Sequence, residues 1–230
     1  MKIEQGRMKL KMLATLVAFV VGLQVLFAQQ PANPPFSKEV SALKSKDSAA
    51  FPPSNTILFT GSSSFTKWTD VNAYFPGYKI VNRAFGGSSL PDLIRYADEV
   101  IIPYHPKQIV IYCGDNDLAA SDSITPQIVL DRFKNLFTQI RNKLPQVHIL
   151  YVAIKPSPSR ERLMPKMVKA NNLIKNFLKA NQHTAFADVY QPMLVAGGKP
   201  NPTLFLQDNL HMNASGYVIW QKVLQPYLLQ

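Results

Sequence analysis

A serine-rich segment and an acid–histidine pair are the parts of this 230-residue chain with the clearest chemical potential. Residues 61–64 read Gly-Ser-Ser-Ser, and a serine hydroxyl becomes an effective nucleophile only beside a general base. Asp208 lies three residues before His211, so one turn of chain could let its carboxylate orient the imidazole as such a base. Taken separately, the serines also fit a helix cap and the acid–histidine pair fits a surface turn.

Two further segments could contact a bound substrate. Residues 82–89 contain the adjacent Gly86 and Gly87, and glycine lets a ligand approach the backbone closely. Residues 114–117 read Gly-Asp-Asn-Asp, in which Asn116 could donate its amide to a developing oxyanion. Each segment alone also fits an ordinary turn. Their combination with the serine and histidine segments favours one catalytic site over four unrelated turns.

These segments fall near the ends of predicted strands, which alternate with helices along the chain. Short apolar runs predict strands, and apolar residues at helical spacing predict helices. The expected strands are residues 56–60, 78–82, 107–113, 147–154 and 184–189, and the expected helices are residues 65–75, 91–102, 125–144, 159–181 and 213–229. This alternation predicts an α/β protein whose parallel sheet carries helices on both faces. Ligands of such sheets bind beyond the carboxyl ends of the strands, where the first three segments would meet.

In their order along the chain, the four segments resemble the motif blocks of the SGNH hydrolases, also called the GDSL esterase/lipase family. The resemblance covers residues 55–230. It implies a three-layer α/β/α, flavodoxin-like fold with a mostly parallel sheet of about five strands. It also implies a catalytic triad in which Ser63 is the nucleophile and His211 and Asp208 are its partners. The backbone N–H groups of Ser63 and Gly87 and the side chain of Asn116 would form the oxyanion hole.

The sequence departs from the family pattern at two positions. Ser62 stands where the family has an aspartate, and Ala84 stands where it has a glycine. The missing aspartate is not the triad acid in the family, so the implied triad stays complete. The spacing from Phe59 and Gly61 places Ser63 as the nucleophile, and its two serine neighbours are expected to be dispensable for catalysis.

The resemblance implies a serine esterase that hydrolyses short-chain acyl esters through an acyl-enzyme. A domain of this length leaves little room for a large lid, so a small acyl ester or an acetylated saccharide is the expected substrate. Residues 190–207 form the longest irregular stretch and are expected to shape one wall of the cleft. Two alternatives remain open: an acyltransferase that uses the same site, and a non-catalytic envelope binding module.

Composition and missing motifs argue against several other classes. Lys and Arg total 25 against 14 Asp and Glu, but the bases are spread along helical stretches, so no nucleic-acid partner is expected. The single cysteine, Cys113, excludes an internal disulfide framework and fits a buried strand residue. The chain has no His-Glu-x-x-His, Gly-x-Gly-x-x-Gly or phosphate-binding loop motif, so the sequence predicts neither a metal site nor a cofactor.

The first 28 residues have the pattern of a secretory signal peptide. Basic residues, Lys2, Arg7, Lys9 and Lys11, precede an apolar run over residues 12–28, and cleavage is expected after Ala28. The mature protein would then be exported to the periplasm or secreted, with no stable membrane insertion; an uncleaved anchor is the alternative. Residues 29–54, rich in Pro, Ser, Ala and Lys, predict a linker or loosely packed N-terminal arm before the domain at 55–230.

Overall fold

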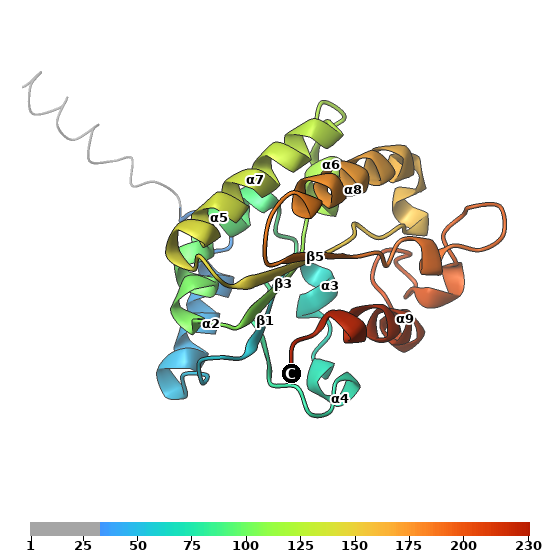
Figure 1. The fold of residues 1–230 in the computed structure, drawn as a ribbon. Coiled ribbons are helices and arrows are strands. Elements are labelled where there is room, and N and C mark those ends of the chain that lie inside the picture. Colours follow the sequence, from blue (N-terminus) through green and yellow to red (C-terminus); the bar gives the residue numbers. More distant parts are fainter. Residues whose placement is uncertain (1–32) are drawn as a thin grey trace, which may run out of the picture. The chain divides into compact units, whose positions relative to one another are not determined.

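A five-stranded parallel sheet forms the centre of the protein (Figure 1). The structure is a computed structural model that describes residues 33–230. The strands are β1 (Ile57–Gly61), β2 (Ile80–Asn82), β3 (Gln108–Tyr112), β4 (His148–Val152) and β5 (Thr184–Ala187). Their order is β2-β1-β3-β4-β5, and every neighbouring pair is parallel. This is the flavodoxin-like strand order, so the predicted fold class is confirmed.

Helices cover both faces of the sheet, which explains why its central strands are apolar throughout. Every residue of β1 and β3 is buried, as expected for strands enclosed between two helical layers. One layer holds α5 (Leu90–Val100), α7 (Pro126–Lys143) and α8 (Met164–Lys179), and the other holds α3 (Ser63–Thr66), α4 (Val71–Tyr74) and α9 (Ala214–Leu224) (Figure 1). Lys38–Gln230 form one compact unit.

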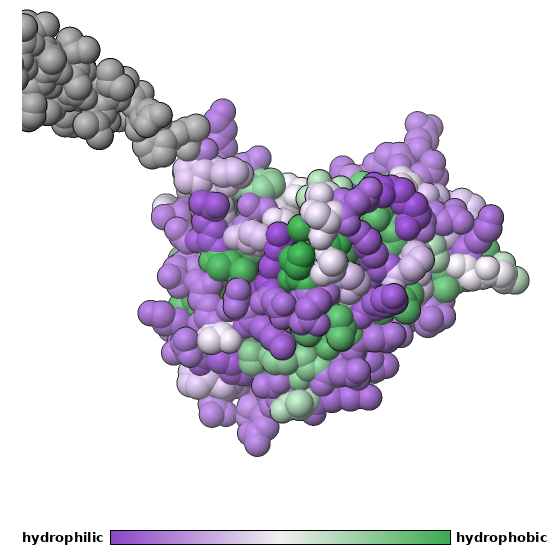
Figure 2. Space-filling model, turned by 90° about the horizontal axis from the view of Figure 1, so that it is seen from above, coloured by the Kyte–Doolittle hydropathy of each residue, from purple (hydrophilic) through white to green (hydrophobic). Residues whose placement is uncertain are grey.

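The outer surface of the α5, α7 and α8 layer is largely hydrophilic. Figure 2, which views the molecule from above this layer, shows hydrophobic side chains only in small separate patches. Lys169 and Lys179 of α8 are exposed to solvent, in keeping with the solvated helix faces expected from the sequence. Within residues 33–230, no helix combines the length and the apolar character needed to cross a membrane.

Local structure departs from the sequence prediction at three places. The helix expected at residues 65–75 is divided into α3 and α4, and this division lets Trp68 and Phe75 both enter one aromatic cluster below the sheet. The helix expected at residues 159–181 begins as the 3₁₀ helix η2 (Pro158–Leu163), and α8 starts only at Met164 because Pro165 suits a first helical turn. The short helix α6 (Asp115–Ala120) follows β3 directly and was not expected.

The remaining 3₁₀ helices are short connections: η1 (Ile102–Tyr104), η3 (Gln191–Met193), η4 (Pro202–Leu204) and η5 (Gln225–Tyr227). Two of them interrupt the irregular stretch at residues 190–207, and η5 takes the last turns of the helix expected at residues 213–229. The signal-peptide prediction falls on residues outside those that the structure describes.

A helix occupies much of the segment predicted to be a linker or loosely packed arm. Helix α2 (Ser37–Ala49) places Asp47 in an ion pair with Arg83, which follows β2. Tyr104 donates its hydroxyl to the same carboxylate, and Asp47 is only 8% exposed. Burial and the hydrogen bond to Asp47 raise the pKa of Tyr104 to about 12, so its hydroxyl keeps its proton at neutral pH. The buried Asp47 carboxylate therefore anchors α2 to the sheet domain. Hydrophobic periodicity in the sequence does not predict such a polar contact.

Replacement of Asp47 by alanine is expected to lower the free energy of unfolding by about 3–5 kcal/mol, because it leaves the Arg83 guanidinium, only 14% exposed, without its carboxylate partner. Asp122→Ala is the matched control, since the Asp122–Arg162 pair is exposed to solvent and should contribute little to stability. Urea unfolding of both variants measures the difference. Equal stability of the two variants would contradict the anchoring role of Asp47.

Candidate active site

The three segments predicted to follow strands meet at the carboxyl edge of the sheet. Gly61 ends β1 with φ +134°, and a Cβ at this position would lie 1.9 Å from the carbonyl oxygen of Tyr112 in β3. Only glycine therefore permits this close approach. Ser62 then donates its N–H to the same carbonyl, and α3 begins at Ser63. The local backbone thus places the serine run at the rim, beside the end of β3.

The structure brings Ser63, His211 and Asp208 together in a hydrogen-bonded chain. The distance from Ser63 Oγ to His211 Nε2 is 3.0 Å, although the two residues are 148 positions apart in the sequence. The distance from His211 Nδ1 to Asp208 Oδ2 is 2.6 Å. When the proton resides on Nδ1, facing the carboxylate, the lone pair of Nε2 faces the serine hydroxyl. This arrangement is the one needed to accept a proton from Ser63.

A tight turn before α9 fixes the acid relative to the histidine. Asp208 Oδ1 accepts the backbone N–H groups of Leu210 and His211, each at 2.9 Å, and Asn209 has a left-handed φ of 55°. Hydrogen bonds from the His211 ring and these N–H groups hold the pKa of the Asp208 carboxyl well below its usual range. Asp208 is therefore ionised at neutral pH, although its side chain is half-exposed.

The glycine loop lies beside the serine turn. Gly61 O accepts the Phe85 N–H at 3.0 Å and the Ser88 hydroxyl at 3.0 Å, which holds the glycine loop against the end of β1. A Cβ on Gly86 would lie 3.9 Å from the Ser63 Cβ, so the loop is in contact range of the serine. Within the described residues, the backbone N–H groups of Ser63 and Gly87 have no hydrogen-bond partner. Both remain available to a ligand.

Asn116 lies in the first turn of α6, and its amide is fully engaged. Nδ2 donates to Ser62 Oγ at 2.7 Å and to the Ser88 carbonyl at 3.0 Å. The backbone at Gly114, with φ +119°, turns the chain from β3 into α6, and a Cβ there would lie 2.9 Å from Ile154. Ser62, which replaces the family's aspartate, is thus an acceptor for Asn116 rather than a neighbour of the histidine.

Sequence reasoning missed Arg160, which reaches the site from η2. Its Nη2 donates to Asn116 Oδ1 at 2.8 Å, and its Nη1 lies 2.9 Å from Asp115 Oδ2. The sequence prediction assigned Arg160 to a solvated basic helix. Its place shortly after the fourth predicted strand, at the same edge of the sheet as Asn116, is the sequence feature that could have identified it.

Lys155 is a second charged residue at this rim that the sequence prediction did not select. It follows β4, is 2% exposed, and its Nζ lies 5.7 Å from the centroid of the Phe205 ring. Burial lowers the pKa of Lys155 to about 8, although the nearby Asp115 and Asp208 carboxylates oppose the shift. Since the folded state binds this proton less tightly than an unfolded lysine does, folding disfavours the charged form.

Stability should therefore rise with pH in a defined interval. Between about pH 8 and about pH 10.4, the unfolded chain still protonates Lys155 while the folded chain has released the proton. The free energy of unfolding of the wild type should rise by about 3 kcal/mol relative to Lys155→Met across this interval. Urea unfolding of both proteins over this pH range measures the change, and the comparison cancels other titrating groups. A constant difference would contradict the prediction.

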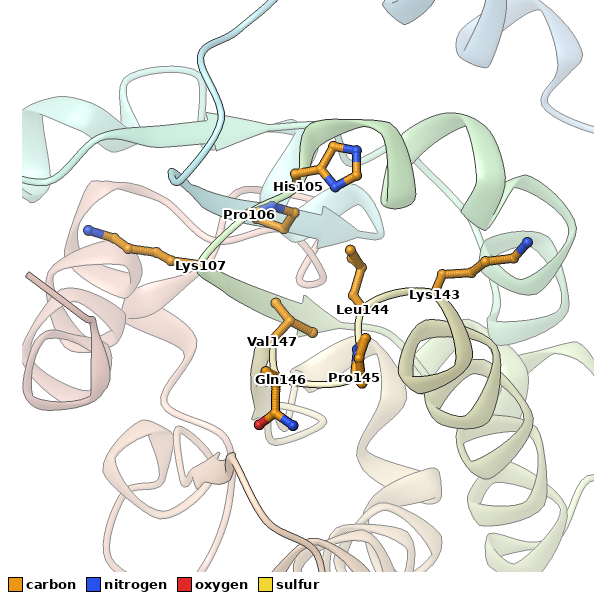
Figure 3. A pocket seen from close by; sticks show the side chains of 8 residues that line it. All are labelled: His105, Pro106, Lys107, Lys143, Leu144, Pro145, Gln146 and Val147. Carbon is orange, nitrogen blue, oxygen red and sulfur yellow. The ribbon is translucent and has the colours of Figure 1, made fainter.

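Cys113 and a cavity at the opposite edge of the sheet are not part of the proposed catalytic chemistry. Cys113 is completely buried, and this burial raises the pKa of its thiol well above the usual value, which confirms the prediction of a structural cysteine. A cavity of about 420 Å³ lies where residues 105–107 lead into β3 and residues 143–147 lead into β4 (Figure 3). It therefore sits at the amino edge of the sheet, opposite Ser63. Its two lysines, Lys107 and Lys143, point away from each other (Figure 3).

A flavodoxin-like sheet that carries a serine turn, a glycine loop, an asparagine turn and an Asp-x-x-His turn at one edge defines a hydrolase of the SGNH type. The chain belongs to the GDSL-like lipase/acylhydrolase family, whose sequence model matches residues 47–219. It is therefore an enzyme that hydrolyses ester bonds. A search of curated proteins found no match.

Solved structures share the fold at low sequence identity. A protein from Streptococcus pneumonia, described as a candidate platelet activating factor, superimposes with a TM-score of 0.73 and 18% identity, covering 93% of this chain and 99% of its own. A GDSL-like lipase from Bacteroides thetaiotaomicron superimposes with a TM-score of 0.69 and 20% identity, covering 82% of this chain and 96% of its own. An acetylxylan esterase from Geobacillus stearothermophilus superimposes with a TM-score of 0.61 and 14% identity, covering 78% of this chain and 97% of its own. These identities establish similarity of fold alone.

Proposed function

We propose that this chain is a serine esterase that hydrolyses short-chain acyl esters, acetylated carbohydrates among them, through a Ser63–His211–Asp208 triad. The observation that carries the proposal is the continuous hydrogen-bonded chain from Ser63 Oγ through both ring nitrogens of His211 to the Asp208 carboxylate. The three groups come from two distant segments, and their order matches nucleophile, base and orienting acid.

The reaction would proceed through an acyl-enzyme. His211 Nε2 takes the proton of Ser63 as Oγ bonds to the ester carbonyl carbon, and the carbonyl π electrons move to its oxygen. As the C–O bond to the leaving group breaks, His211 returns the proton to the departing alcohol. Water then repeats the sequence on the acyl-enzyme and releases the acid. Asp208 keeps the ring in one tautomer and stabilises the imidazolium in both halves.

Three donors would hold the oxyanion: the N–H groups of Ser63 and Gly87 and the Nδ2 of Asn116. Two of these are unengaged within the described residues, whereas Asn116 Nδ2 donates to Ser62 Oγ and the Ser88 carbonyl. An oxyanion accepts a hydrogen bond more strongly than a hydroxyl does, so we expect it to replace Ser62 Oγ as one acceptor of the amide.

Two comparisons support hydrolysis of an acyl ester, and the second favours a small acyl group. The family to which the chain belongs acts on acyl esters. Among the proteins of similar fold, one is an acetylxylan esterase, and its catalytic mutants replace a serine and a histidine by alanine.

Acetate release from acetylated xylo-oligosaccharides, compared with hydrolysis of p-nitrophenyl acetate, butyrate and laurate, tests this proposal. We expect turnover of the acetyl and butyryl substrates, a marked decline with the laurate, and no turnover by Ser63→Ala. An acyltransferase would instead transfer the acyl group to an added sugar alcohol in preference to water, which product analysis by mass spectrometry detects. Saccharide binding without turnover of any ester would identify a binding module and contradict the proposal.

We also propose that the enzyme is exported to the periplasm or secreted and that the mature chain begins near Gln29. The basic leader and the apolar run that ends at Ala28 support this proposal. Mass spectrometry of the intact protein from envelope and extracellular fractions should find a chain that starts close to residue 29. A chain that retains residues 1–28 in the membrane fraction would support an anchor instead.

A further inference from the structure

Arg160 makes the closest charged contact with the proposed oxyanion residue. Its Nη2 donates to Asn116 Oδ1 at 2.8 Å, while its Nη1 lies 2.9 Å from the Asp115 carboxylate. The Arg160 side chain is 16% exposed and that of Asp115 is 7% exposed, so solvent screens both contacts little. Asp115 Oδ1 also accepts the Asn116 backbone N–H at 2.9 Å. The guanidinium thus binds Asn116 directly and binds the residue that holds its backbone.

This contact bears on which end of the Asn116 amide faces the serine turn, and it favours the same orientation as the Ser88 carbonyl, which accepts from Nδ2. The oxygen and nitrogen of an amide are nearly equal in size, so rotation by half a turn exchanges their positions with little steric effect. In one orientation Nδ2 points toward Ser62, and in the other Oδ1 would face the oxyanion and repel it. Because the guanidinium carries only hydrogen-bond donors, it stabilises the orientation in which Oδ1 faces Arg160 and destabilises the one in which the NH₂ group does.

We propose that Arg160 is a positioning residue that holds Asn116 with its amide nitrogen toward the oxyanion. The inference rests on the esterase mechanism proposed above. Among the described residues, Arg160 makes no hydrogen bond with Ser63 or His211, so it would act through Asn116. Its charge also draws electron density toward Oδ1 and so strengthens the Nδ2 hydrogens as donors.

Arg160 also has a structural role, which the experiment must separate from this one. Its removal leaves the buried Asp115 carboxylate without its ion-pair partner, so Arg160→Ala is expected to be less stable than the wild type. Arg160→Lys keeps a positive charge near Asp115 but cannot present a planar fork to the carboxylate and the amide together. Arg162→Ala is the matched control, because Arg162 lies two residues away and forms only an exposed pair with Asp122.

A double-mutant cycle between Arg160→Ala and Asn116→Ala gives the decisive readout, with kcat and KM measured for a short acyl ester. Arg160→Ala should lower kcat by ~10–100-fold and leave KM near the wild-type value, as expected for a misplaced catalytic group. Asn116→Ala should lower kcat by ~10²–10³-fold. The double variant should be no slower than Asn116→Ala alone, since Arg160 then has no amide to position. Arg160→Lys should fold normally and show an intermediate kcat, and Arg162→Ala should match the wild type.

Three results would overturn the inference. The first is an unchanged kcat in folded Arg160→Ala. The second is that Arg160→Ala lowers kcat by the same factor in the wild type and in Asn116→Ala. The third applies if Arg160→Ala fails to fold, and it is a wild-type kcat in Arg160→Lys. Failure of the esterase proposal itself has a different signature: Ser63→Ala would retain turnover, or the wild type would have none. The two failures are therefore distinguishable in the same set of assays.

Discussion

Ser63→Ala is expected to abolish ester hydrolysis while the protein remains folded. The Ser63 hydroxyl is the group within hydrogen-bond distance of His211 Nε2, and alanine offers no oxygen to attack the carbonyl carbon. Removal of a triad nucleophile typically lowers kcat by ~10⁶. The side chain makes no other hydrogen bond among the described residues, so circular dichroism and the unfolding midpoint should stay close to the wild type.

The two neighbouring serines provide controls. Ser62→Ala and Ser64→Ala should remain folded and measurably active, because neither side chain contacts His211. Ser62→Ala removes one acceptor of the Asn116 amide, so a modest change in kcat is expected there. Labelling with a fluorophosphonate probe, followed by peptide mapping, identifies the reactive serine directly. An adduct on Ser62 or Ser64 would show that the nucleophile had been misassigned within the serine run.

His211→Ala is expected to cause a loss of similar size, since the serine then has no base. Asp208→Asn should cost less, ~10⁴ in kcat, because an amide cannot stabilise the imidazolium or enforce the same tautomer. The two variants should share their KM with the wild type if the substrate contacts neither group before the chemical step. Stopped-assay turnover of a short acyl ester measures all three proteins.

His183→Ala is the matched control for the histidine variant. His183 precedes β5 at the amino edge of the sheet, is exposed, and contacts the ring of His148 rather than any residue at the carboxyl edge. Its loss should leave turnover unchanged. Wild-type turnover by folded His211→Ala would contradict the triad and, with it, the proposed mechanism.

The sheet and the location of the site could be predicted from the sequence because both depend on short-range patterns. Buried parallel strands are apolar at every position, and loops at their carboxyl ends are expected to meet. Ser63, Gly87 and Asn116 each follow a strand within a few residues. A correct prediction of β1, β2 and β3 therefore places all three residues at the carboxyl edge of the sheet. Asp208 and His211 are joined by one turn of chain, and their contact required no long-range reasoning.

Two of the features that the sequence did not predict depend on where the charged end groups of long side chains lie in the folded protein. The sequence places Arg160 in a basic stretch, but only the course of η2 shows that its guanidinium turns inward to Asn116. The burial of Lys155 could not be predicted either, because hydrophobic periodicity does not reveal which lysine side chains are buried. The helix at residues 65–75 was predicted as continuous, since the apolar spacing of Phe65, Trp68 and Phe75 fits both one helix and two short ones packed into an aromatic cluster.

The Asp47–Arg83–Tyr104 cluster bears on how the enzyme can be shortened for expression. A truncation at residue 55, where the resemblance to the family begins, would delete α2 and with it the carboxylate that neutralises Arg83. Arg83 directly follows β2, donates its backbone N–H to the Phe59 carbonyl of β1, and donates its Nε to the Tyr104 hydroxyl, so both its backbone and its guanidinium are bonded beside the sheet. A deletion that looks like trimming a disordered leader would therefore remove a countercharge from the edge of the catalytic sheet. We therefore expect a chain that starts ahead of Ser37 to be more stable than one that starts at residue 55.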